Sequence, residues 1–345
     1  MMETPATIPF TGTESAPALY FRWLEERAAM RQGQPEEPDA PFLSVLMRTQ
    51  GKRKETLMEA LLSLEAQSDA DFEVILVIHR ATEADQAETL ALLEELSPFM
   101  KQRVRHFLLD TGTRSAPLNL ALSKARGHYI AMLDDDDVVF ENWIEAFHEA
   151  AKEKNGMAIR CYGMTQFWTL HEDKKGKKVL QSSAAPQPAY CQPFDLLKHF
   201  SDNYTPISCV ALPRACYSVF GIEFDETLTT AEDWDFLMRS MLLCGVHDTK
   251  KITFLYRLWQ NTETSHTLHR ESEWLRNRKY IMEKLDRIPY VTTNAERRAL
   301  ENGEAQEEAV LQLTFRQKLQ RIYRTYGPWR FPFVLIRKAL HRIFG

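Results

Sequence analysis

Hydrophobic residues between positions 41 and 140 follow two alternating patterns. Strand-length runs rich in apolar residues occur at residues 42–47, 73–78, 104–109 and 129–133. Between these runs apolar residues recur every three or four positions, as at Leu57, Leu61 and Leu64, which is the spacing of a helix packed on one face. Strands that alternate with helices form right-handed crossover units. The pattern therefore predicts an α/β fold with a Rossmann-like, mainly parallel sheet flanked by helices.

The pattern changes after residue 140. Strand-like runs at residues 159–169 and 207–212, with a lysine-rich turn near residues 173–178, predict a β-rich extension of the same sheet. Beyond residue 269 the apolar spacing becomes helical.

These changes predict three parts of the chain. Residues 1–40 are rich in Pro, Glu, Ala and Thr and predict a flexible or loosely docked N-terminal extension. Residues 41–266 form the main domain, with halves at 41–140 and 141–266. Residues 267–345 form a helical C-terminal extension.

The composition excludes several classes of protein. Among 345 residues 44% are hydrophobic and 26% are charged, as in an ordinary folded protein, and the formal net charge of -5 argues against a nucleic-acid partner. Five cysteines without a CxxC pair predict neither a disulfide framework nor a zinc knuckle, so we expect a reduced, cytoplasmic location. We see no signal-peptide pattern and no apolar run long enough to span a membrane.

Four consecutive aspartates, at positions 134–137, follow the last of the four predicted strands. Ligands of α/β sheets bind beyond the carboxyl ends of the strands, and adjacent carboxylates repel one another unless a cation or water offsets their charge. In an extended chain the side-chain period of two puts Asp134 and Asp136 on one side. The run predicts a Mg2+ or Mn2+ site that bridges protein oxygens to a phosphate. The alternative is a solvated loop that caps a helix beginning near Asn142.

Several short motifs lie in order around this run. They are Gly112-x-Arg114-x-Ala116-Pro117-x-Asn119, Ala125-x-Gly127-x-Tyr129-Ile130, Leu133 to Asp137, Ala231-Glu232-Asp233-Trp234-Asp235 and Tyr256-Arg257. In this order they resemble the signature of family 2 glycosyltransferases with the GT-A fold, over roughly residues 41–266. The resemblance implies an inverting, metal-dependent transfer of a sugar from a nucleotide-diphosphate donor to a carbohydrate or lipid-linked acceptor, in surface polysaccharide or glycoconjugate assembly. Residues 41–140 would then be the nucleotide-sugar half and residues 141–266 the acceptor half.

The resemblance also implies roles for the residues of the donor side. Asp134 and Asp136 match the family's Asp-x-Asp motif, so we expect Asp136 at the metal and Asp134 near the nucleotide ribose or the metal. We expect Asp135 to bind the donor, and Arg114 to contact its base or phosphate. His266 follows the Tyr256-Arg257 strand and is a candidate third metal ligand, with a surface histidine as the alternative.

A second acidic pair supplies the expected catalytic groups. The acceptor hydroxyl must lose a proton as it attacks the sugar, and a carboxylate is the simplest base. We therefore expect Asp233 to be the general base and Glu232 to orient the acceptor. Both also lie in the first turn of a predicted helix, where acidic residues are favoured simply by the helix dipole.

The chain departs from the family pattern at the end of its second strand. The family usually has an aspartate there that reads the nucleotide base, whereas this chain has His79, which leaves the base open. His79 could still bind a base edge, and Thr49 at the end of the first strand is expected near the nucleoside.

Two other functions remain open. The pattern Asp134-x-Asp136-x-Val138 also fits haloacid-dehalogenase-like phosphatases, with Asp134 as nucleophile and Asp136 as acid, although three strands precede it here. A degenerate transferase domain that binds a sugar or a protein is the non-enzymatic alternative.

The end of the chain differs in charge from the rest. Residues 309–345 contain no acidic residue and interleave Lys and Arg with aromatic and aliphatic residues. This pattern predicts a helix lying on anionic lipid at the inner face of a membrane, or alternatively a helix docked on protein.

Overall fold

The computed structural model describes residues 39–174, 178–260, 269–288 and 298. The chain divides into two compact units, Met1–Pro289 and Tyr290–Gly345, and every helix and strand described below lies in the first. The predicted N-terminal extension up to residue 38, the candidate ligand His266 and the basic tail lie outside the described residues. The predicted boundary at residue 266 stays a prediction.

The first four strands form the predicted parallel sheet. They are β1 (Leu43–Thr49), β2 (Phe72–His79), β3 (Val104–Leu109) and β4 (Tyr129–Met132). Their order is β3-β2-β1-β4, and each neighbouring pair is parallel. Every residue of β2 is buried, as expected for a strand covered on both faces.

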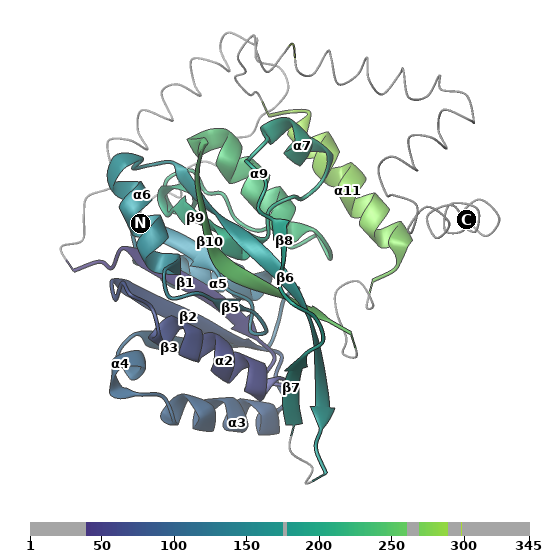
Figure 1. The fold of residues 1–345 in the computed structure, drawn as a ribbon. Coiled ribbons are helices and arrows are strands. Elements are labelled where there is room, and N and C mark those ends of the chain that lie inside the picture. The colour runs from purple at the N-terminus through teal and green to yellow at the C-terminus, as the bar shows by residue number, and fades with distance from the viewer. Residues whose placement is uncertain (1–38, 175–177, 261–268, 289–297, 299–345) are drawn as a thin grey trace. The chain divides into compact units, whose positions relative to one another are not determined.

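Helices connect these strands and cover both faces of the sheet. They are α2 (Lys54–Glu65), α3 (Glu83–Glu94), the short α4 (Pro98–Lys101) and α5 (Ala116–Lys124). In Figure 1, α2 lies in front of the sheet and α5 behind it. Leu57, Leu61 and Leu64 of α2 are buried against the strands, which confirms the helix predicted from their spacing.

The second half of the sheet is mostly antiparallel. Its strands are β5 (Val138–Val139), β6 (Ala158–Glu172), β7 (Lys178–Ser182), β8 (Gln187–Tyr190), β9 (Val210–Pro213) and β10 (Val246–Trp259). The sheet continues from β4 in the order β9-β6-β10-β5, with β7 and β8 paired to β6. The predicted β-rich extension is therefore confirmed. The segment 207–212, however, begins as a 3-10 turn, η1 (Ile207–Cys209), before it joins β9.

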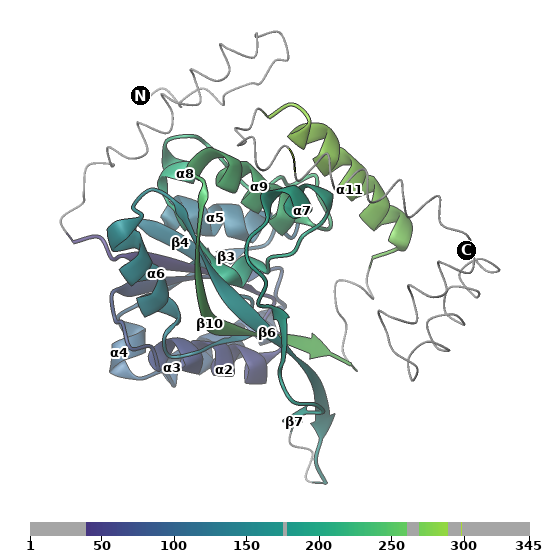
Figure 2. The same cartoon turned by 45° about the horizontal axis from the view of Figure 1, so that its top comes forward.

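The remaining helices surround this second half. They are α6 (Trp143–Glu153), α7 (Leu196–Ser201), α8 (Ala215–Ser218), α9 (Glu232–Cys244) and α11 (Glu271–Leu285). Figure 2 shows α7, α9 and α11 grouped together. Trp234 and Met238 of α9 pack with Ile281 and Leu285 of α11 in a small apolar cluster of their own. Burying these side chains fixes α11 on α9, and so beside the acidic motif at the start of α9.

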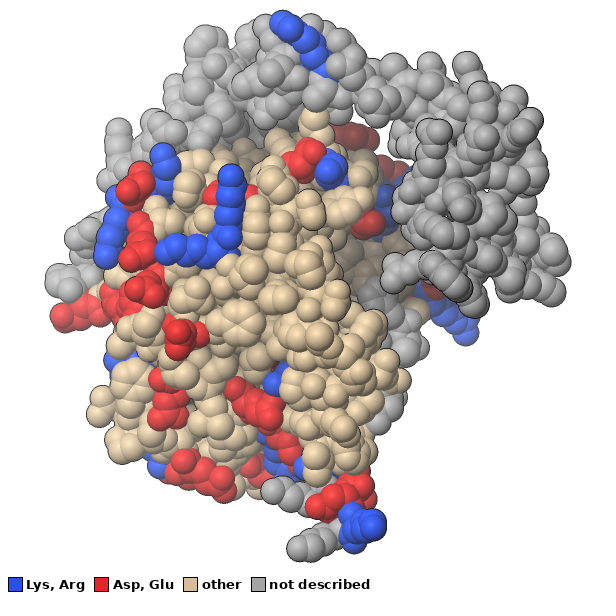
Figure 3. All heavy atoms as spheres, viewed as in Figure 1, with Lys and Arg blue, Asp and Glu red and all other residues tan. Residues whose placement is uncertain are grey.

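Two further properties of the described residues concern membrane-spanning helices and surface charge. Within the described ranges, none of the helices combines the length and the apolar character that a membrane crossing needs. Figure 3 shows a face whose centre is largely uncharged, with acidic and basic side chains intermingled around its edges.

Candidate active site

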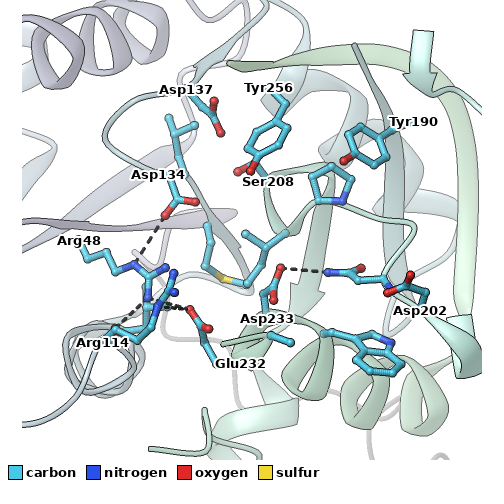
Figure 4. Close-up of a pocket in the computed structure, with 18 of the residues that line it drawn as sticks. Arg48, Arg114, Asp134, Asp137, Tyr190, Asp202, Ser208, Glu232, Asp233 and Tyr256 are labelled. Atoms are coloured by element: carbon cyan, nitrogen blue, oxygen red, sulfur yellow. Dashed lines mark hydrogen bonds and ion pairs between the residues drawn. The ribbon is translucent and has the colours of Figure 1, made fainter. Parts of the chain in front are cut away.

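A cavity of about 390 Å³ lies where the carboxyl ends of β1 and β4 meet the first turns of α9 and α11. Asp134 and Asp137 from the first acidic motif line it, and so do Glu232 and Asp233 from the second (Figure 4). The fold thus brings together two motifs that are far apart in the sequence, at the edge of the sheet where ligands of such folds bind.

The four aspartates do not continue the extended chain of β4. Residues 135 and 136 form a turn, in which the backbone N–H of Asp137 donates to the carbonyl of Asp134 at 3.3 Å. The expectation that Asp134 and Asp136 share one side of an extended strand is therefore wrong. The turn brings Asp134 and Asp137 to the cavity, whereas Asp136 is not among its lining residues.

Asp135 and Asp136 are held by one arginine. The Arg53 guanidinium at the start of α2 donates to Asp135 Oδ1 at 3.0 Å and also binds Asp136. Thr49 donates to Asp135 Oδ2 at 2.6 Å, and its hydroxyl accepts from the backbone N–H of Gly51 at 3.1 Å. Thr49 and Asp135, both expected to bind the donor, thus bind each other and are buried.

The carboxylates of this run are crowded. Burial, together with the charges of Asp134 and Asp135, raises the pKa of Asp136 to about 6 despite Arg53. Burial and the charge of Asp136 raise the pKa of Asp137 well above its usual range, although Asp137 accepts from the backbone N–H of Arg257 at 2.8 Å. A divalent cation would stabilise the ionised forms of both groups.

The acidic residues at the cavity could supply only part of the ligands of a bound metal. The described residues include no cluster of three or more His, Cys, Asp or Glu side chains arranged to hold one. Asp134 and Asp137 nevertheless offer hard oxygen ligands at the cavity, and the Asp134 side chain is 39% exposed. Mg2+ is typically bound by one or two carboxylates together with substrate phosphates and water. The residues therefore fit a cation that takes most of its ligands from the substrate and solvent.

Glu232 is enclosed by two arginines. Its Oε1 lies 2.9 Å from Nε of Arg114 and 3.2 Å from Nη1 of Arg48, and only 3% of its side chain is exposed. Arg48 also donates to the backbone carbonyl of Arg114 at 2.8 Å. Arg114 therefore lies at the cavity as expected, but it pairs with the second acidic motif.

Asp233 has a different environment from its neighbour. The Nδ2 group of Asn203 donates to its Oδ2 at 3.0 Å, while Asn203 Oδ1 accepts from the backbone N–H of Thr205 at 3.1 Å. This second bond fixes the orientation of the amide group. Burial, followed by the charge of Glu232, raises the pKa of Asp233 to about 6. A carboxyl group with such a pKa is matched to proton transfer near neutral pH.

The backbone just before this acidic pair is unusual. Ala231 has φ of 57°, in the left-handed region that residues with a side chain rarely adopt. This conformation turns the chain sharply into α9, so that Glu232 and Asp233 both begin the helix at the cavity. Such strain typically costs about 1–3 kcal/mol and clusters at functional sites.

His79, which was expected at a base edge, and Trp234, which follows the acidic pair, both have structural contacts. His79 is buried at the end of β2, where its Nε2 lies 3.0 Å from the carbonyl of Thr111, and burial lowers its pKa. Trp234 is 2% exposed and donates through its indole N–H to the carbonyl of His199 at 2.8 Å. Its position fits core packing better than stacking on a sugar.

The structure adds lining residues that sequence reasoning missed. Tyr190 and Tyr256 line the cavity with their rings edge to face, 6.3 Å between centroids, and Trp274 of α11 lines it as well. Arg48 lies one residue before the end of β1, at the binding edge of the sheet, and this position is a signal that could have found it. Asn203 lies in a loop without any recognisable motif.

Comparison with known proteins identifies relatives of this chain. Residues 44–214 match the model of the family described as glycosyl transferase family 2. An uncharacterised glycosyltransferase of Methanocaldococcus jannaschii is 23% identical over 218 residues, which cover 62% of this chain and 68% of that protein. The poly(ribitol-phosphate) beta-N-acetylglucosaminyltransferase TarP of Staphylococcus aureus is 26% identical over 125 residues, which cover 35% of this chain but only 37% of TarP.

Solved structures share the fold. Residues 1–349 of S. aureus TarS in complex with UDP-GlcNAc superpose with a TM-score of 0.58 and 17% identity, over 81% of this chain and 78% of that one. The same protein in complex with UDP gives a TM-score of 0.54 and 18% identity, with the same coverage. This likeness confirms the predicted GT-A fold.

Proposed function

The chain belongs to glycosyl transferase family 2 through residues 44–214, and from this premise we propose that it is an inverting, metal-dependent transferase that uses a nucleoside diphosphate sugar. The membership makes it a glycosyltransferase and decides against the phosphatase that the Asp134-x-Asp136 pattern had left open. The proposal covers the donor, the inversion of the anomeric configuration, the metal and the acceptor.

The observation that carries the proposal is the different treatment of two adjacent carboxylates. Glu232 is paired with two arginines, whereas Asp233 accepts from the uncharged amide of Asn203 and has a pKa raised to about 6. When the environments of two neighbouring acids differ in this way, their roles can be assigned. Glu232 is the acid held by arginines, and Asp233 is the group that exchanges a proton.

The reaction then proceeds as a single displacement. Asp233 accepts the proton of the acceptor hydroxyl while the hydroxyl oxygen forms a bond to the anomeric carbon of the donor sugar. The bond from that carbon to the diphosphate oxygen breaks, and its electron pair leaves with the nucleoside diphosphate. Attack opposite the leaving group inverts the anomeric configuration. A divalent cation, when bound by Asp134, Asp136 or Asp137, would offset the charge of the leaving diphosphate.

The acceptor is proposed from the relatives. The name of TarP describes transfer of N-acetylglucosamine to a poly(ribitol phosphate), so we infer that this chain also glycosylates a cell-surface polymer or glycoconjugate. Tyr190, Tyr256 and Trp274 supply aromatic faces on which a carbohydrate can stack. The basic residues 309–345 would hold the enzyme at an anionic membrane surface, where such acceptors are assembled.

Calorimetry with UDP, GDP, CDP and ADP, each with and without Mn2+, tests the proposal. We expect one nucleoside diphosphate to bind, more tightly when Mn2+ is present, and its sugar conjugates to release that diphosphate on turnover. Failure of all four to bind would refute the nucleotide-sugar function. Trapping of an acyl phosphate at Asp134 would instead restore the phosphatase.

A further inference from the structure

Arg48 occupies a central position in the cavity. It is the sixth residue of β1, and its guanidinium lies between the two acidic motifs, with Nε 3.7 Å from Asp134 Oδ1 and Nη1 3.2 Å from Glu232 Oε1 (Figure 4). Its side chain is 19% exposed and lines the cavity. Its contacts with Arg114, Glu232 and Asp134 run through Nε and Nη1, so Nη2 is the nitrogen that can donate to an additional partner.

The convergence of two guanidinium groups needs an explanation. Arg48 and Arg114 both bind the same oxygen, Oε1 of Glu232, which is almost completely buried. Two like charges brought to one carboxylate oxygen repel each other, and Asp134, 3.7 Å from Arg48, offsets part of their charge. Two guanidinium groups held side by side at the cavity present charged donors of the kind that bind phosphate.

The positions of the cationic side chains indicate where in the cavity a diphosphate would bind. Its lining carries six carboxyl groups, from Asp134, Asp137, Asp202, Glu232, Asp233 and Glu271, and three guanidinium groups, from Arg48, Arg114 and Arg278. Arg278 binds the backbone carbonyl of Ser201 and lies 3.8 Å from Asp202, on the side of α7 and α11. A diphosphate beside Asp134 therefore meets two cationic side chains, Arg48 and Arg114.

We propose that Arg48 is a ligand of the donor diphosphate, and that Glu232 is the positioning residue that holds Arg48 and Arg114 together for this contact. The inference rests on the proposed nucleotide-sugar function. It gives Glu232 a different role from the one expected from the sequence, because an acid enclosed by two arginines is not available to orient an acceptor hydroxyl. Arg48 bound to Glu232 through Nη1 would contact the diphosphate through Nη2.

Substitution of Arg48 tests the contact directly. Arg48→Gln and Arg48→Lys are compared with the wild-type protein by calorimetry, using UDP, GDP, CDP and ADP and the corresponding nucleosides as probes. Hydrogen bonds to a charged group typically contribute about tenfold to a hundredfold in affinity. We expect Arg48→Gln to weaken the nucleoside diphosphate that binds wild type by about this factor, and to change nucleoside affinity by less than about twofold. Arg48→Lys should lie in between, since it keeps the charge but loses the fork of donors.

A matched control separates this effect from a loss of charge or of folding. Arg126 precedes β4 at the opposite end of the sheet, is half-exposed and shares Glu73 with Arg105, so Arg126→Gln removes the same charge away from the cavity. This control should bind both probes as wild type does. Equal weakening of nucleoside and nucleoside diphosphate by Arg48→Gln, or no weakening of either, would overturn the inference. If wild type binds none of the four diphosphates, the proposed function itself fails.

Discussion

Replacing Asp233 with asparagine should abolish transfer and at the same time stabilise the protein. In the folded state burial and the charge of Glu232 raise the pKa of Asp233 from an ordinary value of 3.8 to about 6. The ionised carboxylate is therefore less favourable in the folded protein than in the unfolded chain. Asparagine has nearly the same shape, and its carbonyl oxygen can still accept from Asn203.

The size of this stabilisation and its dependence on pH follow from the pKa of Asp233. Because the folded pKa is raised, wild-type stability falls as pH rises from about 4 through 6, and above that range the ionisation costs up to about 3 kcal/mol, at 1.36 kcal/mol per pKa unit. The variant carries no such cost. The difference in unfolding free energy between variant and wild type should thus be small at pH 4 and reach up to about 3 kcal/mol at pH 7.5. Asp136 also titrates near pH 6 but is present in both proteins, so the comparison cancels it.

Urea unfolding at pH 4, 5, 6 and 7.5 measures this difference, with Asp71→Asn as a control at an exposed aspartate. Activity, followed by release of the nucleoside diphosphate, should fall by about a hundredfold to ten-thousandfold, the usual contribution of a general base, while donor binding persists. In wild type the rate should rise with pH through about 6, since the base must be ionised. A variant that is active, or whose stability relative to wild type does not change between pH 4 and 7.5, would refute the assignment of Asp233.

Three further predictions follow from single contacts. Asn203→Ala removes the donor that orients Asp233. The turnover rate should therefore fall by about tenfold or more with little change in donor KM, and the acid limb of the pH profile should move above 6. An unchanged profile would contradict this role. Arg53→Ala removes the guanidinium that competes with a metal ion for the aspartates at residues 135 and 136. Titration of the nucleotide-bound protein with Mn2+ should therefore show an affinity for Mn2+ about tenfold higher than that of wild type. A lower affinity would count against a metal at this turn. Gly127→Ala places a Cβ 2.6 Å from a backbone nitrogen of β1, which should lower the free energy of unfolding by about 1–3 kcal/mol; wild-type stability in urea would contradict this.

Local sequence patterns were enough to predict the first half of the fold. The spacing of the leucines of α2 and the apolar runs of β1 and β2 identify these elements directly, and a parallel sheet follows from the alternation of strand and helix. The second half was only partly predictable. Strand β10 is long, carries several polar residues and pairs with β6 across register shifts, so its extent depends on partners far away in the sequence.

The residues of the candidate site could also be predicted only in part. Its acidic residues could be predicted because Asp134 and Asp233 belong to motifs of fixed spacing. Of their cationic and amide partners, Arg48 could have been found from its place near the end of β1, whereas Arg53 and Asn203 belong to no recognisable motif and become partners only through folding. The turn at residues 135 and 136 was missed for a related reason, since the strand period holds only while hydrogen bonds keep the chain extended.

The partners of each acid explain why both motifs are needed. Arginines pair with Asp134, Asp135, Asp136 and Glu232, whereas Asp137 and Asp233 accept from uncharged donors, the backbone N–H of Arg257 and the side chain of Asn203. These last two carboxyl groups line the same cavity and have raised pKa values. Burial also raises the pKa of Asp135 and of Asp136, but neither of these two is among the residues that line the cavity. A cation that arrives with the donor would neutralise the carboxylate of Asp137, and a proton from the acceptor would neutralise that of Asp233. Each motif thus leaves one carboxyl group for one substrate, which is the arrangement that a transfer between two bound molecules requires.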